Sequence, residues 1–385
     1  MSNIPLSVPT LDGNEWKYIK ECLDTNWVSS AGKYVELFEK KVCDFTKSKY
    51  AIACVNGTSA IHISLKLAGV KKGDEVIVPT LTFIAPINAV SYNGADPIFM
   101  DSDDFYNIDV RKTIDFVKNE TIFKNGFTYN KKTHKKISAV LPVHVWGNAV
   151  GLDELIPFCK KRNISVVEDA SESLGTFYTS GDYEGRDTGT IGRLGCLSFN
   201  GNKIITAGGG GMILTDDLDL AKEAKYFTTQ AKDDPIKYVH NNIGFNYRLT
   251  NIQAALGVAQ LELLKTKLNK KREIHNYYKS MIKEIPGLKI ASTPLYSSNN
   301  YWLNILQIDN LIYKRSVSEL LQKCIKNKIE TRPVWMLNHE QSPYKNYQTY
   351  NINKANELVK NSICLPSSPD LTTEILDRII SVLNG

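Results

Sequence analysis

Lys203 has the sequence surroundings that best suit covalent chemistry in this chain of 385 residues. It lies within residues 197–212, between apolar runs and just before four consecutive glycines at 208–211. Glycine has no Cβ, so backbone and ligand can approach closely there. A desolvated lysine can attack a carbonyl carbon and form a Schiff base. The glycine run could also indicate a nucleotide loop, but the pattern G-x-x-x-x-G-K-[ST] is absent.

Two acids, Glu168 and Asp169, directly follow the apolar run at 164–167. In an open α/β sheet, ligands bind at the carboxyl ends of the strands. An acid at that point could pair with the ring nitrogen of a pyridine cofactor and keep it protonated, which makes the ring an electron sink. A carboxylate that only caps the next helix is the alternative interpretation.

A third segment, Asn56-Gly57-Thr58-Ser59-Ala60, reads as the end of a strand, a turn and the start of a helix. Free N–H groups and the helix dipole make such a start an anion site. A plain helix cap would use the same residue types. Because all three segments occur in this order on one α/β pattern, we interpret them together as a site for a phosphate-bearing pyridine cofactor.

The elements that must position these residues alternate between residues 50 and 215. We expect strands at 50–55, 75–78, 97–100, 139–145, 164–167 and 211–215, and helices at 58–68 and 85–92. This alternation predicts an α/β fold with a mainly parallel sheet and helices on both faces.

Outside that region the pattern changes. Residues 111–137 are polar and predict a helix followed by a surface insertion, whereas 252–285 predict one long helix that ends near Pro286-Gly287. We therefore expect a large cofactor-binding domain with an N-terminal arm at 1–255, and a smaller C-terminal α+β domain at 256–385 entered by that helix. The C-terminal signals are mixed and lie at 301–307, 317–326 and 372–383.

Composition excludes several classes of protein. Hydrophobic residues make up 42% and charged residues 23%, as in ordinary globular chains, and no apolar run reaches the roughly 18 residues of a membrane span. The start of the chain shows no export signal, so we expect a cytoplasmic protein without membrane partners. Seven scattered cysteines without a C-x-x-C pair predict reduced thiols, and the six histidines show no metal-ligand spacing, so no metal is expected. The net charge is +6, but the basic run at 131–136 lacks interleaved aromatics and predicts a solvated loop rather than a nucleic-acid site.

The combined motifs resemble the sugar aminotransferases of the DegT/DnrJ/StrS family over nearly the whole chain. The resemblance is carried by residues 27–32, 55–60, 74–83, 167–175, 198–203, 244–253 and 331–335. It implies the type I aminotransferase fold, with a mainly parallel seven-stranded sheet in the large domain. It also implies pyridoxal 5'-phosphate as the cofactor and L-glutamate as the amino donor.

The resemblance implies roles for single residues. Lys203 matches the lysine that carries the cofactor, and Asp169 matches the acid that pairs with the pyridine nitrogen. Phe83 stands where an aromatic ring stacks on the cofactor, and Glu172 is a candidate cofactor contact at a position that varies in the family. The phosphate-binding positions are Gly57, Thr58, Ser59 and Ser198. The positions expected to reach a neighbouring subunit's site are Asn246 and Arg248, which implies a homodimer with shared sites. The substrate-binding candidates are Arg332, Trp335 and His339.

The sequence of residues 198–206 most resembles that of enzymes that aminate C4 of a UDP-linked 4-keto-6-deoxy-N-acetylhexosamine. Those enzymes serve the bacillosamine and legionaminic acid pathways of bacterial glycan synthesis. GDP-perosamine-type synthases share the Gly-Phe/Tyr-Asn-Tyr-Arg pattern of residues 244–248 and remain an alternative, as do 3-keto sugar aminotransferases. Some keto-sugar dehydratases replace the lysine with histidine, and Lys203 argues against that activity. A non-catalytic regulatory protein that binds the cofactor is a further alternative, against which Lys203 and Asp169 both argue.

Overall fold

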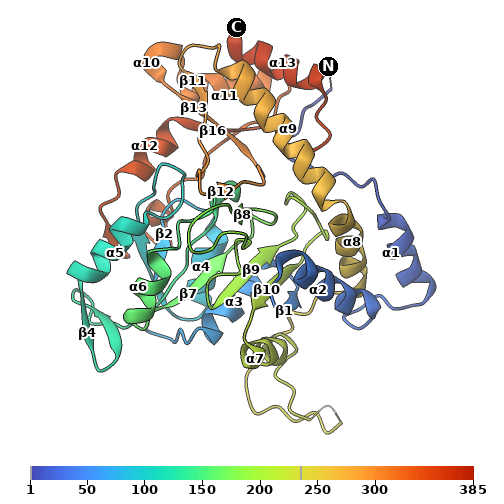
Figure 1. The fold of residues 1–385 in the computed structure, drawn as a ribbon, viewed down its shortest axis with the longest axis vertical. Helices are drawn as coiled ribbons and strands as arrows, with labels where there is room; N and C mark the ends of the chain where they lie inside the picture. The colour runs from blue at the N-terminus through green and yellow to red at the C-terminus, as the bar shows by residue number, and fades with distance from the viewer. Residues whose placement is uncertain (1, 235) are drawn as a thin grey trace.

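An eight-stranded sheet forms the centre of the computed structural model, which describes residues 2–234 and 236–385 (Figure 1). Its strands, in spatial order, are β1 (Tyr50–Cys54), β10 (Gly211–Thr215), β9 (Leu194–Ser198), β7 (Ser165–Asp169), β6 (Ile137–Val140), β2 (Glu75–Pro79), β3 (Asp96–Met100) and β15 (Thr349–Tyr350). Neighbouring strands from β9 to β15 run parallel, while β10 is antiparallel to both of its neighbours. The mainly parallel sheet predicted from the sequence is confirmed, but it has eight strands rather than the expected seven, because the two-residue β15 from the C-terminal part pairs with β3.

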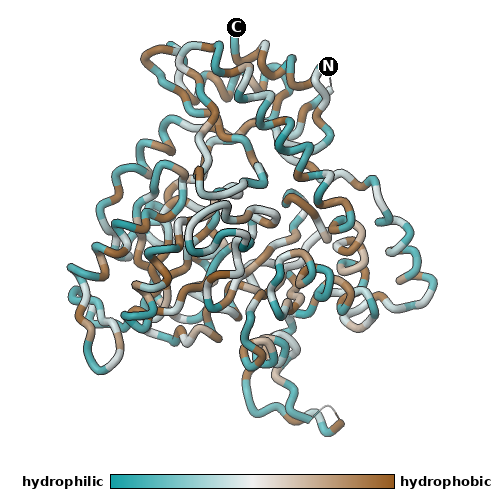
Figure 2. The backbone as a smooth tube through the Cα atoms, in the orientation of Figure 1, coloured by the Kyte–Doolittle hydropathy of each residue, from teal (hydrophilic) through white to brown (hydrophobic). Residues whose placement is uncertain are grey.

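Burial on both faces explains why these strands read as nearly continuous apolar runs. Every residue of β2 and β10 is buried. Along β1 the side chains alternate, so that Ile52 and Cys54 join one apolar cluster while Ala51 and Ala53 join another. Figure 2 shows hydrophobic residues gathered along the central strands. Strand β9 was not among the expected strands, since its sequence Leu-Gly-Cys-Leu-Ser has no β-branched residue.

Helices cover both faces of this sheet, as alternation of strands and helices predicts. One face is covered by α3 (Gly57–Leu67), α4 (Ile84–Tyr92) and α7 (Leu218–Thr228). The other is covered by α2 (Lys33–Thr46), α5 (Val110–Asn119), α6 (Leu155–Lys161) and α8 (Asn251–Glu262). Helix α1 (Glu15–Asp24) lies beside α8 (Figure 1). After α5, the strands β4 (Thr121–Lys124) and β5 (Phe127–Asn130) form a hairpin, which confirms the predicted helix and surface insertion.

A second, four-stranded antiparallel sheet follows in the C-terminal part. Its strands are β11 (Leu288–Ile290), β13 (Asn304–Ile308), β16 (Ser362–Leu365) and β14 (Arg332–Pro333). The helices α9 (Leu264–Ile282), α11 (Val317–Lys326) and α13 (Thr373–Asn384) share one apolar cluster with it. The remaining short elements are β8 (Phe177–Tyr178), β12 (Ser297–Ser298), α10 (Asn310–Tyr313), α12 (Lys354–Lys360) and the 3-10 turns η1 (Val145–Gly147) and η2 (Asn338–Glu340).

The single long helix expected over 252–285 is a pair of helices, which corrects the prediction. The backbone of Leu263, at φ −98° and ψ 1°, separates α8 from α9. Helix α8 packs closely on α2: a Cβ at Gly257 would lie 2.7 Å from the Phe38 ring. Helix α9 is mostly hydrophilic along its length (Figure 2) and leads to the C-terminal sheet. The expected division between residues 255 and 256 falls inside α8 and stays a prediction. Within the residues that the structure describes, no helix combines the length and apolarity needed to cross a bilayer.

Candidate active site

The three segments singled out in the sequence meet at the carboxyl ends of adjacent strands. Asp169 is the last residue of β7, Lys203 follows β9, and α3 begins at Gly57 just after β1. Because β1, β9 and β7 point the same way, their carboxyl ends share one edge of the sheet. This is the edge at which open α/β sheets bind ligands.

The glycines near Lys203 shape the backbone of its loop. Gly208 and Gly210 have φ values of 72° and 109°, a conformation that residues with a Cβ rarely adopt. A Cβ at Gly211 would lie 2.4 Å from the carbonyl oxygen of Asn56. The N–H of Phe199 donates to the carbonyl of Gly210 at 2.9 Å and closes the loop. The glycine run therefore brings the Lys203 loop against the start of α3.

A group of N–H donors and hydroxyls surrounds the N-terminus of α3. The Asn56 side chain caps the helix by accepting the N–H of Ser59 at 2.8 Å. A Cβ on Gly57 would lie 2.8 Å from Cβ of Ser198 and 3.1 Å from Oγ of Ser171. A cavity of about 460 Å³ opens here, lined by Asn56, Thr58, Ser59, Tyr92 and Tyr247. First-turn N–H groups and convergent hydroxyls suit a phosphate group.

Asp169 is 3% exposed, and its Oδ1 accepts the N–H of Ser171 at 2.9 Å. Burial raises the pKa of the Asp169 carboxyl, while the hydrogen bonds from Ser171 and the charge of Lys203 oppose that rise. The charged form of a buried carboxylate whose pKa is raised is stabilised by an additional N–H donor or cation. A protonated pyridine nitrogen would supply one.

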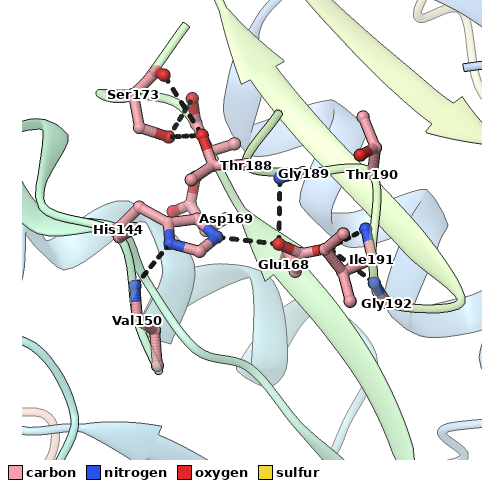
Figure 3. A network of polar contacts seen from close by, with 12 residues as sticks. His144, Val150, Glu168, Asp169, Ser173, Thr188, Gly189, Thr190, Ile191 and Gly192 are labelled. Carbon is pink, nitrogen blue, oxygen red and sulfur yellow. Dashed lines mark hydrogen bonds and ion pairs between the residues drawn. The ribbon is translucent and has the colours of Figure 1, made fainter. Parts of the chain in front are cut away.

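Glu168, the residue before Asp169, is held by a closed network (Figure 3). Its carboxylate is 0% exposed and accepts the N–H groups of Gly189, Ile191 and Gly192 at 2.9, 2.6 and 2.5 Å. Oε2 also lies 2.9 Å from Nε2 of His144. Burial alone would raise the pKa of Glu168, but the hydrogen bonds from His144 and the backbone together lower it.

His144 has a defined tautomer in this network. Its Nδ1 accepts the N–H of Val150 at 3.0 Å, so Nε2 carries the proton that it donates to Glu168. The backbone N–H of His144 donates to the carbonyl of Asp169 at 3.0 Å. His144 and Glu168 therefore fix the backbone from which Asp169 projects.

The amine of Lys203 lies between a carboxylate and an indole ring. Nζ is 3.6 Å from Oε1 of Glu172 and 4.1 Å from the centre of the Trp302 ring. The Lys203 side chain is 13% exposed and that of Glu172 is 4% exposed. Burial raises the pKa of Glu172 to about 7, an effect that the charge of Lys203 and the N–H of Trp146 oppose.

A row of aromatic rings that includes the substrate-binding candidate Trp335 begins beside Glu172. Oε2 of Glu172 accepts the N–H of Trp146 at 2.8 Å, and Trp146 stands at φ 53°. The Trp146 and Trp335 ring centres are 5.0 Å apart, and those of Trp335 and Phe83 are 6.2 Å apart. Phe83 is 51% exposed, so a ligand can reach its side chain.

Two further candidates lie along the same C-terminal stretch as Trp335. Nδ1 of His339 is 2.6 Å from Oγ1 of Thr80, just beyond the end of β2. Arg332 is exposed on β14 and pairs with Cys364 of β16. The structure thus brings His339 to the sheet edge that holds Asp169, while Arg332 extends into solvent.

The segment between α7 and α8 projects from the sheet (Figure 1), and its C-terminal part contains Asn246 and Arg248. Asn246 pairs with Thr229, and Nη2 of Arg248 is 3.4 Å from Oε1 of Gln230. Among residues 2–234 and 236–385, neither has a hydrogen bond to Lys203, Asp169 or Glu172. The buried Nε of Arg248 has no partner in the described part of the chain.

Sequence reasoning missed four residues of this site: His144, Ser171, Trp146 and Trp302. Ser171 could have been noticed, because it lies two positions after Asp169. The other three are brought in from distant segments, and no local pattern marks them.

The residues present fit pyridoxal 5'-phosphate. The α3 N-terminus with Ser171 and Ser198 can take the phosphate, Asp169 can take the ring nitrogen, and the amine of Lys203 can bond to the aldehyde carbon. Trp335, which packs on Trp146 beside Glu172, and its neighbour Phe83 offer aromatic faces.

Comparison with known proteins agrees with this fit. The pattern of the DegT/DnrJ/EryC1/StrS aminotransferase family matches residues 9–384. EpsN of Bacillus subtilis (strain 168), described as a pyridoxal phosphate-dependent aminotransferase, is 35% identical over 385 residues, which cover 99% of this chain and 95% of EpsN. A GDP-perosamine synthase of Escherichia coli O157:H7 is 37% identical over 386 residues, covering 100% and 98%. Among solved structures, DesI in the presence of its TDP-sugar product superposes with a TM-score of 0.88 at 24% identity, covering 100% and 93%.

The Glu168 network leads to a prediction about stability. In Glu168→Gln, one carboxylate oxygen becomes an NH₂ group that faces either His144 or backbone N–H groups. Two hydrogen-bond donors then face each other and one hydrogen bond is lost. We expect a loss of about 3 kcal/mol in the free energy of unfolding at neutral pH. Because the folded-state pKa of Glu168 is lowered, its stabilisation is present above its ordinary pKa and is lost as pH falls through the folded value.

Urea unfolding at neutral pH and at about pH 4 measures both effects. The difference in the free energy of unfolding between wild type and variant should be smaller at the lower pH. Glu184→Gln, the same substitution at an exposed position, is the matched control. A variant as stable as the control at neutral pH would contradict the described network.

Proposed function

The chain belongs to the DegT/DnrJ/EryC1/StrS aminotransferase family, and from that premise we propose that it transfers an amino group from L-glutamate to C4 of a nucleotide-linked 4-keto-6-deoxy sugar. It is a pyridoxal phosphate-dependent sugar aminotransferase. The observation that carries the proposal is the position of the Lys203 amine, beside Glu172 and on the sheet edge where Asp169 ends β7.

The residues of the chain have distinct tasks in this proposal. Bound here, pyridoxal 5'-phosphate supplies an aldehyde carbon and a protonated ring that withdraws electrons from the substrate. Asp169 holds the proton on the ring nitrogen. Nζ of Lys203, once released, takes the proton from Cα of the donor and later delivers a proton to C4 of the sugar. Gly57, Thr58, Ser59 and Ser198 hold the phosphate, and Phe83 limits the movement of the ring.

Two classes of nucleotide sugar are compatible with the proposal as the amino acceptor. The sequence of residues 198–206 favours a UDP-linked 4-keto-6-deoxy-N-acetylhexosamine, used for bacterial surface glycans or nonulosonic acids. The 37% identity to a GDP-perosamine synthase favours a GDP-linked sugar. Arg332, Trp335 and His339 remain the proposed substrate contacts, and an exposed guanidinium at Arg332 suits a diphosphate.

We also propose a homodimer in which Asn246 and Arg248 complete the partner's site. The unpartnered Nε of Arg248 and the projecting segment that carries it support this arrangement. Exposed apolar residues on the same segment, Ile243 at 85% and Tyr238 at 72%, suit burial against a second copy.

Lys203→Ala tests the cofactor assignment. We expect the variant to lose the visible absorbance of lysine-bound pyridoxal phosphate and to lose turnover by at least about a thousandfold, because the amine is both the attachment point and the proton carrier. Absorbance spectra and a glutamate-dependent assay measure the two effects. Lys47→Ala, at an exposed lysine, is the control, and full activity in Lys203→Ala would refute the proposal.

A substrate panel tests the sugar. Wild-type enzyme, pyridoxal phosphate and glutamate are incubated with UDP-linked and GDP-linked 4-keto-6-deoxy sugars and with a 3-keto sugar, and products are identified by mass spectrometry. We expect amination of a 4-keto sugar. Conversion of the 3-keto sugar alone would overturn the C4 assignment, and the preferred 4-keto sugar decides between UDP and GDP.

Subunit mixing tests the shared site. We expect Lys203→Ala chains to be inactive and Arg248→Ala chains to be weakened when each is assayed alone. When they are refolded together, heterodimers contain one site with both Lys203 and Arg248 only if the two residues come from different chains. Random exchange then restores about one quarter of wild-type activity. No restoration in a mixture shown to contain heterodimers would place Arg248 in the site of its own chain.

A further inference from the structure

The amine of Lys203 rests in a cradle made by two residues, the Glu172 carboxylate and the Trp302 ring. Nζ lies 3.6 Å from Oε1 of Glu172 and 4.1 Å from the Trp302 ring centre. A carboxylate and an indole face are the two side-chain surfaces that best stabilise an ammonium ion outside water.

Both walls of this cradle are fixed by contacts of their own. Trp302 is 3% exposed, and its Nε1–H donates to the carbonyl of Asn202 at 2.6 Å. Its backbone carbonyl accepts from the buried Nζ of Lys271 at 2.9 Å, and its backbone N–H donates to the Asn300 side chain. These contacts hold the indole ring whether or not Lys203 is present.

Glu172 is fixed from the opposite side. Oε2 accepts the N–H of Trp146 at 2.8 Å, while Oε1 is turned toward Lys203. The Asn300 side chain, which also fixes Trp302, donates to the carbonyl of Glu172 at 2.9 Å. One asparagine therefore sets the spacing between the two walls.

We propose that Glu172 and Trp302 form a resting position for the Lys203 amine whenever it is not bonded to the cofactor. The inference rests on the proposed role of Lys203 as the cofactor lysine. In each catalytic cycle that lysine is released as a neutral amine and becomes an ammonium when it takes the proton from the donor. The ammonium must then be held inside a site with little water until it delivers that proton. Glu172 and Trp302 are thus positioning residues that act through Lys203.

The cradle has a measurable consequence for adduct formation. When an ammonium bonds to an aldehyde carbon, it gives up one proton to solvent, and the aldehyde oxygen leaves as water with the two remaining amine protons. Stabilising the ammonium in the cradle therefore opposes adduct formation. Removal of the cradle should let Lys203 bond to the aldehyde at lower pH and with higher affinity.

The charged state of Glu172 sets the pH range of this effect. The ionisable groups that face it are Lys203, Asp169 and Cys364. Burial raises the pKa of Glu172 to about 7, so its carboxylate is charged above that pH and neutral well below it. The influence of the carboxylate is thus greatest on the alkaline side and fades as pH falls through about 7.

A simple contact between Glu172 and the cofactor predicts the opposite sign. If Glu172 only bound the cofactor, its replacement would weaken cofactor binding and move adduct formation to higher pH. The direction of the change therefore separates the two roles.

The experiment uses the full-length apoenzyme and pyridoxal 5'-phosphate as the probe. Adduct formation is followed by visible absorbance over a pH series, and borohydride reduction with peptide mass spectrometry verifies that Lys203 is the modified residue. Glu172→Gln keeps the shape and can still accept the N–H of Trp146. We expect its midpoint for adduct formation to fall by about one pH unit, and its affinity at pH 8 to rise about tenfold.

Trp302→Phe provides a second variant, because phenylalanine has a weaker cation-binding face than tryptophan. We expect a shift in the same direction but smaller. Glu184→Gln at an exposed position should match the wild type. Circular dichroism and the unfolding midpoint establish that each variant is folded.

Each outcome has a separate meaning. A midpoint in Glu172→Gln that is unchanged or moved to higher pH overturns the resting position. A wild-type enzyme that forms no adduct at Lys203 overturns the cofactor assignment instead. A lower midpoint with tighter binding, together with the smaller shift in Trp302→Phe, supports the cradle.

Discussion

Three carboxylates, Glu168, Asp169 and Glu172, are buried within five residues of one another at the end of β7. Burial of a carboxylate away from water is costly unless hydrogen bonds or opposite charges compensate it. The three acids are compensated in different ways. Glu168 accepts three backbone N–H groups and the Nε2–H of His144. Asp169 accepts from Ser171, and Glu172 accepts the N–H of Trp146 and lies beside the amine of Lys203. The degree of compensation separates the structural acid from the two that face the site.

The surrounding elements follow from this requirement. The loop at 189–192 turns three N–H groups onto Glu168, and His144 crosses from the end of β6 to supply a fourth donor. Trp146 adopts φ 53°, a conformation that costs a bulky residue free energy, and its N–H then reaches Glu172. The strained residue Trp146 lies beside Glu172, and the hydrogen bond from its N–H to the buried Glu172 carboxylate offsets the strain.

Local sequence was sufficient to place Asp169 and the start of α3 at the ends of strands, while the roles of these residues stay predictions. Asp169 ends β7 and α3 begins just after β1, whereas β9, the strand that precedes the Lys203 loop, has no β-branched residue and was not expected. Local sequence was insufficient where partners come from elsewhere: Trp302 is 99 residues from Lys203, and nothing in its segment signals that contact. The break at Leu263 was missed because apolar periodicity continues through it without proline or glycine.

The contrast between Glu168 and Glu172 also explains how one short segment can serve both stability and chemistry. A fully compensated carboxylate such as Glu168 gains nothing from a further ligand, so it holds the strand end in place in every state of the enzyme. A partly compensated carboxylate such as Glu172 changes its energy whenever the neighbouring amine moves or changes charge. Because Asn300 ties Glu172 to Trp302, movement of Lys203 changes the charge environment between two walls that themselves stay fixed. In the proposed reaction, Lys203 can therefore change between a charged ammonium and a neutral bonded form without rearrangement of the fold around it.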